Sequence, residues 1–359
     1  MDELKYIGMD VHSATTSIAV RDGQGRLVME ATVATEAAAL SDFLRGLRGR
    51  LWLTFEEGNW AAWLTQVLTP QVEKLIVCNP RRNASLKQGS KSDPLDARQL
   101  AHLLQANLLR PVYHQAAGPQ TLQELARAYT TCVGDSTRVM NRIKARYRAR
   151  GILCSGSRVY RPRFRQPWFE QLTDPGARQR VELLYTQLDF LQELRKKARR
   201  ALLTEARRDP ACSLLRTVPG VGPVRAALLL ALLSTPFRFR TKRQLWMYAG
   251  LGLITRDSGQ YQTVRGHIIR RDRPACVRGL NPEHNRELKE IFKGAALVAT
   301  RSSSPLHAFY QQRLDQGMRP HLARLTLARK IASLTWTLWK KGERFNAHHL
   351  TSQVTSQAE

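Results

Sequence analysis

Short apolar runs alternate with amphipathic stretches over the first third of the chain. Runs that are apolar, or that alternate between apolar and polar residues, predict strands four to eight residues long. Five such runs are present: Tyr6–Met9, Thr16–Val20, Leu27–Val33, Leu51–Phe55 and Lys74–Cys78. Gly and Asp residues at 22–25 predict a turn between the second and third runs.

Three segments between or after these strands have helical spacing. In Ala37–Leu47, apolar residues at positions 40, 43, 44 and 47 follow the i, i+3, i+4, i+7 pattern. Trp60–Leu68 is the second predicted helix, and Asp93–Leu109 is the third. Ser92 is a candidate N-cap for the third helix, and Pro94 suits its first turn. The order of elements predicts an α/β N-terminal domain and resembles the ribonuclease H-like nuclease fold.

The rest of the chain is predicted to be mainly helical. Within the basic middle region, six apolar residues fall on a/d heptad spacing, which indicates a coiled coil. They are Val181, Leu184, Leu188, Leu191, Ala198 and Leu202. Pairing between two chains and packing inside one chain both remain open from the sequence. Residues 154–167 are expected to form a loop, and Leu322–Trp339 an amphipathic helix followed by a disordered polar tail.

The charge balance identifies the class of partner. The chain has 57 Lys and Arg against 29 Asp and Glu, a formal net charge of +28. Such an excess binds phosphates through counterion release, so nucleic acid is the leading partner and an anionic membrane surface the weaker alternative. The longest apolar stretch, Ala226–Leu233, is too short to span a bilayer.

Two further features indicate the compartment. The five cysteines contain no C-x-x-C pair and are odd in number, which favours a reducing cytosol over a disulfide framework or a structural zinc site. The segment Met1–Lys5 has no apolar core, so no secretory signal is expected.

Carboxylates stand out in this basic chain. Asp10 and Glu56 each end a predicted strand, and Asp93 and Asp96 lie three apart at a predicted helix start. Oxygen ligands of this kind bind Mg²⁺, and paired ions about 4 Å apart can activate and stabilise oxygens in phosphoryl transfer. Taken together, these four residues are the predicted metal ligands, although each one alone is more simply interpreted as a turn residue, a helix-dipole partner or a surface charge. Glu57 is an adjacent rival to Glu56.

His12 stands close to the first acid. It is open to contact with phosphate, but a histidine at a strand end more often has a structural role, and the sequence favours that interpretation.

Two glycine-containing segments carry the other chemical candidates. Gly220 and Gly222 lie in a turn that opens an apolar helix, where backbone N–H groups could contact a phosphate, although an ordinary helix–helix turn is as good an interpretation. Ser258 lies in a basic, Gly-flanked loop, which suits a serine nucleophile, although on chemistry alone a loop serine far more often has a structural role. The remaining predicted nucleic-acid contacts are cationic: Arg81, Arg82, Lys91, Arg142, Lys144, Arg146, Arg148, Arg256, Arg265, Arg270 and Arg271.

Five motifs in a fixed order resemble one family. They are Ile7–His12, Phe55–Gly58, Lys91–Arg98, Pro219–Pro223, and Gly250–Leu253 leading to Ser258-Gly259. Together, over about residues 5–345, they resemble the DEDD-type insertion-sequence transposases, which are bridge-RNA-guided recombinases related to the Piv-type DNA invertases. One departure from the family pattern is the long basic segment Arg265–Arg278, which places the local shape around Ser258 in question.

The resemblance implies a domain plan. Residues 1–112 would form a RuvC-like domain whose Asp10, Glu56, Asp93 and Asp96 bind Mg²⁺ or Mn²⁺. Residues 113–210 would be a basic helical and coiled-coil region, 211–345 a mainly helical transposase domain, and 346–359 a disordered tail. Ser258 would attack DNA and form a covalent phosphoserine link.

The resemblance also implies partners and a location. These would be donor and target DNA, a noncoding bridge RNA and further copies of the chain, from dimer to tetramer, with no membrane. The protein would be located in the prokaryotic cytoplasm, in association with the nucleoid. Two alternatives stay open: a Holliday-junction resolvase that uses only the metal site, and a non-catalytic nucleic-acid-binding protein.

Overall fold

The computed structural model describes residues 3–80, 92–113, 120–255, 261–264, 266–270, 277–301 and 303–351. The chain divides into two compact units, Met1–Gly118 and Pro119–Glu359. Ser258, Arg81, Arg82 and Lys91 lie outside the described residues, as do Arg256, Arg265 and Arg271. Across the described parts of both units, no helix combines the length and apolar character needed to cross a membrane.

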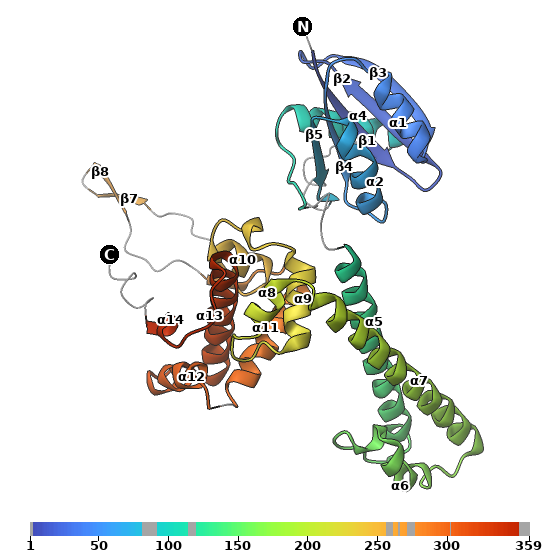
Figure 1. The fold of residues 1–359 in the computed structure, drawn as a ribbon, viewed down its shortest axis with the longest axis vertical. Coiled ribbons are helices and arrows are strands. Elements are labelled where there is room, and N and C mark those ends of the chain that lie inside the picture. Colours follow the sequence, from blue (N-terminus) through green and yellow to red (C-terminus); the bar gives the residue numbers. More distant parts are fainter. Residues whose placement is uncertain are drawn as a thin grey trace. The chain divides into compact units, whose positions relative to one another are not determined.

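A mixed five-stranded sheet forms the centre of the N-terminal unit (Figure 1). Its strands are β1 (Leu4–Val11), β2 (Thr15–Arg21), β3 (Leu27–Ala34), β4 (Arg50–Glu56) and β5 (Lys74–Cys78). The spatial order is β3-β2-β1-β4-β5. Strands β1, β2 and β3 pair antiparallel, whereas β1, β4 and β5 run parallel. All five strands predicted from the hydrophobic pattern are confirmed.

Helices cover both faces of this sheet (Figure 1). The helices are α1 (Ala37–Arg45), α2 (Ala61–Leu68), the short 3-10 turn η1 (Thr69–Gln71) and α4 (Asp93–Gln105). On one face, Ile7 and Phe55 pack with leucines of α1 and α2 in a fully buried core. On the other face, α4 packs on Tyr6 and Trp52 through Leu100 and its neighbours. Because side chains alternate along a strand, each residue of β1 belongs to one of these two layers.

Two long helices, α5 (Gln120–Arg148) and α7 (Pro175–Ala206), form an antiparallel pair in the second unit (Figure 1). Ile143 of α5 packs with Val181 and Leu188 of α7 near one end, and Leu202 packs near the other. Of the a/d residues of α7, Val181, Leu188 and Leu202 are therefore buried inside one chain, and the other three are partly buried there. Of the two alternatives that the sequence leaves open, the structure shows packing within the chain for this seam.

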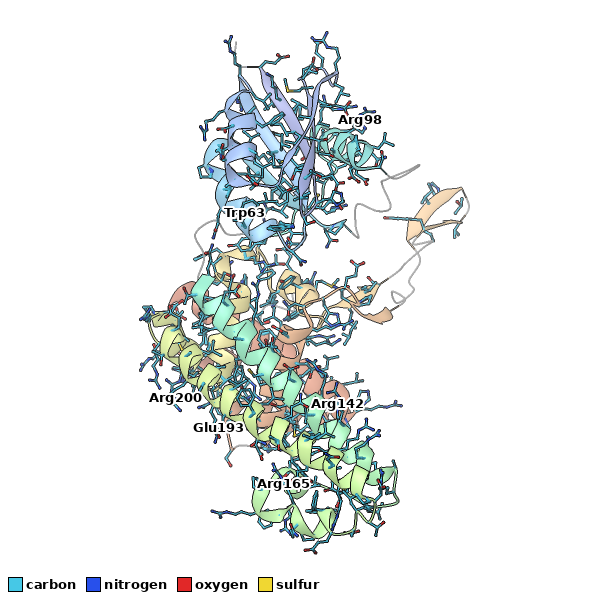
Figure 2. The ribbon with its side chains drawn as sticks, turned by 90° about the vertical axis from the view of Figure 1, so that its right-hand side faces the viewer. Trp63, Arg98, Arg142, Arg165, Glu193 and Arg200 are labelled. Atoms are coloured by element: carbon cyan, nitrogen blue, oxygen red, sulfur yellow. The ribbon has the colours of Figure 1, made fainter. Side chains whose placement is uncertain are left out.

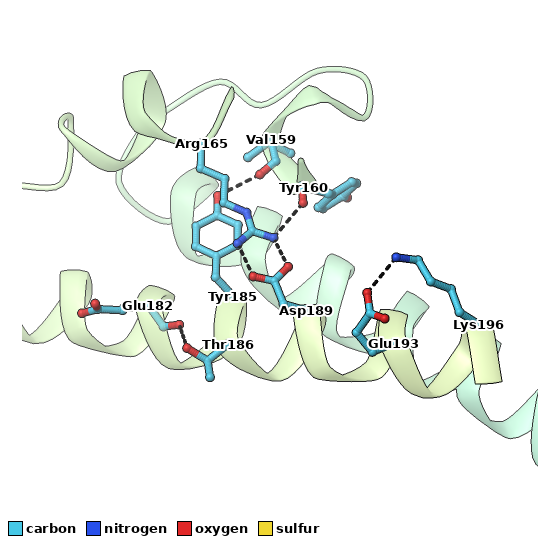
Figure 3. Close-up of polar contacts among 9 residues, drawn as sticks. All are labelled: Val159, Tyr160, Arg165, Glu182, Tyr185, Thr186, Asp189, Glu193 and Lys196. Atoms are coloured by element: carbon cyan, nitrogen blue, oxygen red, sulfur yellow. Dashed lines mark hydrogen bonds and ion pairs between the residues drawn. The ribbon is translucent and has the colours of Figure 1, made fainter. Parts of the chain in front are cut away.

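A cap of short helical turns closes the far end of this pair. It consists of η2 (Arg158–Tyr160), η3 (Pro162–Phe164) and α6 (Gln166–Phe169), where the sequence predicts only a loop. Arg165 holds the cap to α7 through a two-pronged ion pair with Asp189, with Nη1 to Oδ2 at 2.7 Å (Figure 3). The Arg165 guanidinium also lies 4.2 Å from the ring centre of Tyr185, and it donates to the carbonyl of Tyr160.

The remaining helices pack together around α9 and α13 and form the largest core of the second unit. They are α8 (Pro210–Leu215), α9 (Pro223–Leu233), η4 (Pro236–Arg238), α10 (Lys242–Tyr248), α11 (Arg286–Ala299), α12 (Pro305–Asp315), α13 (Pro320–Lys341) and α14 (His348–Thr351). The predicted helix Leu322–Trp339 corresponds to α13. Of the expected disordered tail, His348–Thr351 is helical and residues 352–359 lie outside the described part.

Two small antiparallel sheets occur where the sequence indicates mainly helix. One pairs β6 (Leu253–Thr255) with β9 (Val277–Leu280), and the other pairs β7 (Tyr261–Val264) with β8 (His267–Arg270). Strands of three or four residues are too short to give a clear two-residue alternation. Gly266, at φ +79°, lies between β7 and β8 and is the kind of turn signal that marks such a hairpin.

Candidate metal centre

Asp10 lies near the end of β1, on the face of the sheet that α4 covers. Tyr6, Gly8 and Asp10 alternate with the core residues Ile7 and Met9, so they share this face. The Asp10 side chain is 20% exposed. Its carboxylate is thus partly withdrawn from water at an edge where the parallel strands β1 and β4 both end.

Gly8 allows α4 to approach this edge closely. A Cβ atom on Gly8 would lie 2.2 Å from the carbonyl oxygen of Ala97 and 2.4 Å from the backbone nitrogen of Ala101. Only glycine therefore fits beneath the helix at this position. The small residues Ala97 and Ala101 are themselves buried against Ala19 of β2. This contact brings the first turn of α4 towards the end of β1.

The first turn of α4 carries two of the predicted acids. Ser92 occupies the N-cap position, as predicted, although its side chain makes no capping hydrogen bond. Pro94 follows in the first turn, and Asp93 and Asp96 are the acidic residues of that turn. Arg98, one turn further on, forms a two-pronged ion pair with Glu30 of β3, with bond lengths of 2.5 and 2.6 Å. This ion pair holds α4 to β3 of the sheet (Arg98 is labelled in Figure 2).

Three ligand atoms converge at the end of β1. His12 Nε2 lies 3.1 Å from Asp10 Oδ2 and 3.4 Å from Asp93 Oδ1. All three atoms lie within 4.8 Å of one another. Two predicted ligands, Asp10 and Asp93, are thus brought together from segments more than 80 residues apart in the sequence.

His12 is a member of this cluster, whereas the sequence favours a structural role for it. The signal that could have found it is the two-residue period of β1, since His12 follows Asp10 by two positions and so extends the same face. No local pattern indicates the contact of His12 with Asp93, because the two residues are more than 80 positions apart in the sequence.

Asp96 acts on the same site through its charge. It is half-buried, and its negative charge and that of Asp93 both raise the pKa of Asp10. Asp96 is not among the three residues whose ligand atoms converge, so the described geometry places it beside the cluster.

Glu56 ends the strand beside β1. Met9 pairs with Phe55 in the parallel register, so Asp10 and Glu56 are the next residues along both strands. Thr54 and Trp52 share their face with Gly8 and Tyr6, and the two-residue period therefore directs Glu56 to the Asp10 side of the sheet. Glu57 is exposed, and its N–H is bonded to the carbonyl of Cys78. Strand geometry thus favours Glu56 over its neighbour, although Glu56 is not among the three converging residues.

Charge and burial perturb the two residues at the centre of the cluster. Partial burial is the largest influence on Asp10 and raises its pKa, against the hydrogen bond from His12 that lowers it. The hydrogen bond to Asp10 and the attraction of that carboxylate raise the pKa of His12. Three carboxyl groups thus crowd together with one imidazole to offset them, and a bound cation would relieve this repulsion.

The donor set fits a divalent metal ion. Carboxylate oxygens from β1 and α4 are the ligands that Mg²⁺ and Mn²⁺ take in proteins, and the imidazole of His12 adds a nitrogen donor. Asp93 and His12 have side chains that are 57% and 51% exposed, so the cluster is open to solvent and to a substrate on one side.

The predicted cationic contacts on α5 have different roles. Arg142 and Arg148 are exposed, and Arg142 projects from α5 in Figure 2. Lys144 instead donates to the carbonyl of Gly156 at 2.8 Å and lies against the Tyr160 ring, so it holds the cap. Arg146 is half-exposed.

Arg270, another predicted cationic contact, is the last residue of β8, and its side chain lies outside the described part.

The turn before α9 is shaped by packing. Gly220 has φ +86°, and a Cβ atom there would lie 2.4 Å from the carbonyl oxygen of Ala295 in α11. Gly222 is the N-cap of α9 and has open space beside it. Gly220 is therefore needed for contact between helices, whereas no atom within 4 Å closes the space beside Gly222.

Comparisons with known proteins cover both units. Residues 7–146 match a family model for DEDD transposases of the IS110 type, described as a transposase. Residues 212–311 match a second model, described as the transposase IS116/IS110/IS902 family. The first match includes all four predicted acids, and the second includes Ser258.

Two curated relatives agree with these matches. The "Insertion element IS116 uncharacterized 44.8 kDa protein" of Streptomyces clavuligerus is 26% identical over 179 residues, which are 49% of this chain and 42% of that protein. The "Putative transposase y4pF/y4sB" of Sinorhizobium fredii (strain NBRC 101917 / NGR234) is 25% identical over 305 residues, which are 80% of this chain and 71% of that protein. The chain thus spans less than half of the first relative. On the two family matches, the chain belongs to the IS110/IS116/IS902 family of insertion-sequence transposases.

Proposed function

We propose that this chain cuts and rejoins DNA as the transposase of an insertion sequence, with Asp10, Glu56, Asp93 and Asp96 as ligands of divalent metal ions. The observation that carries the proposal is the convergence of Asp10 and Asp93 at the end of β1. The strand order and directions support a ribonuclease H-like, RuvC-like fold for this unit. When bound, Mg²⁺ or Mn²⁺ would polarise a phosphodiester and offset the charge that develops on it.

The chain's own residues would prepare this site. Gly8 and the Arg98–Glu30 pair hold α4 against the sheet, so Asp93 and Asp96 keep a fixed position relative to Asp10. Metal-binding geometry then needs little rearrangement when DNA arrives. The negative charges of Asp93 and Asp96 repel the Asp10 carboxylate, so holding these acids together costs stability, which is typical of a functional site.

Ser258 is the proposed nucleophile that makes the covalent bond to DNA. Its Oγ would attack the phosphorus of a phosphodiester and form a phosphoserine bond. The bond from phosphorus to the leaving strand oxygen would break, and that oxygen would take up, through water, the proton that the serine hydroxyl loses. Attack by a hydroxyl of the other DNA strand would then reverse the exchange and release the serine. The exposed cations of α5, among them Arg142 and Arg148, would bind nucleic-acid phosphates.

The partners follow from the same proposal. Donor and target DNA would be selected through a noncoding bridge RNA, and several copies of the chain would assemble around them. The basic character of the chain, +28 in formal charge, supports extended contact with such polyanions.

Recombination on a supercoiled plasmid tests this function. The plasmid carries the element ends and the target, and the reaction contains the cognate RNA and Mg²⁺. Asp10→Ala, Glu56→Gln and Ser258→Ala should each lose recombination by at least about 100-fold. Glu57→Gln is the matched control for Glu56→Gln and should recombine within about threefold of the parent, since strand alternation turns it from the site.

Each outcome removes a different part of the proposal. Parent-like recombination by Asp10→Ala would refute the metal site, and by Ser258→Ala the serine mechanism. Metal-dependent cleavage of a branched junction without a covalent protein–DNA adduct would favour a junction resolvase. Binding of nucleic acid without any strand cleavage would favour a non-catalytic binding protein.

A further inference from the structure

We propose that His12 is a nitrogen ligand of the metal centre and gives that centre a preference for Mn²⁺ over Mg²⁺. This inference rests on the proposed metal function of the acids. It adds a ligand that lies outside the four-acid set.

The spacing of the ligand atoms supports direct coordination. Bonds of about 2.1 Å around an octahedral ion place neighbouring ligand atoms about 3 Å apart. His12 Nε2 lies 3.1 Å from Asp10 Oδ2 and 3.4 Å from Asp93 Oδ1. One ion could therefore replace the present hydrogen bond and bind all three atoms with only small side-chain shifts.

The backbone fixes His12 at this position. Its N–H donates to the carbonyl oxygen of Thr15 at 3.0 Å, and its carbonyl oxygen accepts a bond from the Thr35 hydroxyl at 2.9 Å. The Thr35 hydroxyl also lies 2.9 Å from that of Thr16, which is fully buried. Both ends of the residue are thus held by the β1–β2 turn and the end of β3. The backbone of His12 is thus fixed, and the hydrogen bond between its imidazole and Asp10 already turns the side chain towards the cluster.

The imidazole nitrogen of His12 determines which ion binds more tightly. Mg²⁺ prefers oxygen ligands and retains its water, whereas imidazole nitrogen binds first-row transition ions more strongly. Mn²⁺ also accepts carboxylate and water, so it suits a mixed site of two aspartates and one histidine. The half-exposed imidazole leaves the remaining positions of such an ion open to water or DNA phosphate.

Electron paramagnetic resonance with Mn²⁺ tests the proposal on the untagged full-length chain. Pulsed measurements detect coupling between bound Mn²⁺ and a directly coordinated imidazole nitrogen, so the parent protein alone gives a decisive signal. Titrations with Mn²⁺, and with Mg²⁺ as competitor, then give the two dissociation constants for the parent and for His12→Gln.

The matched control is His102→Gln. His102 lies on α4 in the same unit, and its Nδ1 is 3.3 Å from Arg21 Nη1, far along the helix from Asp93. We expect nitrogen coupling in the parent and in His102→Gln, and none in His12→Gln. The Mn²⁺ dissociation constant should rise about 10- to 100-fold in His12→Gln, whereas that of Mg²⁺ should change by less than about threefold.

Failure of this inference differs from failure of the proposed function. Bound Mn²⁺ without nitrogen coupling, or with equal affinity in His12→Gln, would overturn the role of His12 and leave the acid site intact. A parent protein that binds neither ion, with or without DNA, would overturn the metal site itself and the role of His12 with it.

Discussion

The acid cluster of the N-terminal unit and the Arg165–Asp189 pair of the helical unit hold charged groups in opposite ways. At the cluster, Asp96 and Asp93 raise the pKa of Asp10, so groups of like charge are held together. At the cap, Arg165 meets Asp189 with two parallel bonds and also covers the Tyr185 ring (Figure 3). A bound cation would offset the negative charge of the acid cluster, whereas Asp189 already neutralises the charge of Arg165.

The difference separates function from stability. A charge whose partner is in the same chain holds the fold together, and its loss should weaken the fold. A charge that repels its neighbours weakens the fold, and its retention indicates a role in binding. The four predictions below test this distinction, from the largest expected effect to the smallest.

Asp10→Asn should abolish metal-dependent strand cleavage, with a loss on the order of 1,000-fold, and yet leave the protein at least as stable in the presence of a chelator. The raised pKa of Asp10 means that folding favours its protonated form. The resulting stability is present at low pH, below the ordinary carboxyl pKa, and is lost as pH rises through the raised value. At neutral pH, the neutral amide of Asp10→Asn should therefore remove the loss of stability that the ionised carboxylate causes.

Thermal melting with EDTA at neutral pH measures this second effect, with metal titration as the companion measurement. A clear fall in the melting temperature of Asp10→Asn without metal would show that the carboxylate is structural. It would place Asp10 in the same class as Asp189.

Gly8→Ala should destabilise the N-terminal unit by about 3 kcal/mol and lower metal affinity with it. The added Cβ would overlap backbone atoms of Ala97 and Ala101, which cannot move without shifting α4. Gly23→Ala is the matched control, because the nearest atom to its Cβ would be 3.8 Å away. Denaturant unfolding followed by hydrogen exchange checks whether the loss is confined to residues 3–113. Equal stability of the two variants would mean that α4 does not pack on β1 as described.

Arg165→Gln should destabilise the cap by about 1–2 kcal/mol. The Arg165 side chain is 13% exposed, but Asp189 is 44% exposed, and solvent screening reduces the cost below that of a fully buried pair. Glu193→Gln is the control on the same helix. Glu193 and Lys196 are 63% and 66% exposed, so this change should have almost no effect (Figure 3).

A double-mutant cycle with Asp189→Asn isolates the pair energy of Arg165 and Asp189. Hydrogen exchange over residues 152–172 provides the local readout. A coupling energy near zero would show that the cap is held by its apolar contacts alone.

Alkaline pH should loosen the same end of the helical unit. Tyr147 and Tyr185 share a hydrogen bond of 3.1 Å between their hydroxyls, and burial raises the pKa of both. Folding favours the neutral phenols, so this stability is complete below about pH 10 and is lost as pH rises above it. Phenolate absorbance should show two tyrosines that titrate only as the cap opens. Ordinary titration of all tyrosines with the cap intact would contradict the buried pair.

The sequence predicts the N-terminal sheet well because each strand there carries its own signal. Runs such as Leu51–Phe55 and Lys74–Cys78 are apolar and bounded by polar turns, and the structure confirms them almost residue for residue. The short strands β6 to β9 have too few residues for such a signal, and β6 also pairs with a strand, β9, that lies more than 20 residues further along the chain. Heptad spacing in α7 predicts a packed seam but cannot identify the partner, which the structure shows to be α5.

The site is predicted in part for a related reason. Asp10, Asp93 and Asp96 are visible as acids at element ends, since local pattern is sufficient to place them there. The contact of His12 with Asp93 depends on how closely α4 approaches β1, and Gly8 determines that distance. Likewise, strand alternation distinguishes Glu56 from Glu57 only when the parallel register of β1 and β4 is known.

Anomalous diffraction from crystals of the full chain with Mn²⁺ is the most direct test of the central claim, that the end of β1 and the start of α4 form one metal centre. We predict a peak within coordination distance of both Asp10 and Asp93 that is absent from crystals of Asp10→Asn. A well-occupied Mn²⁺ peak elsewhere in the molecule, with none at these aspartates, would contradict the account.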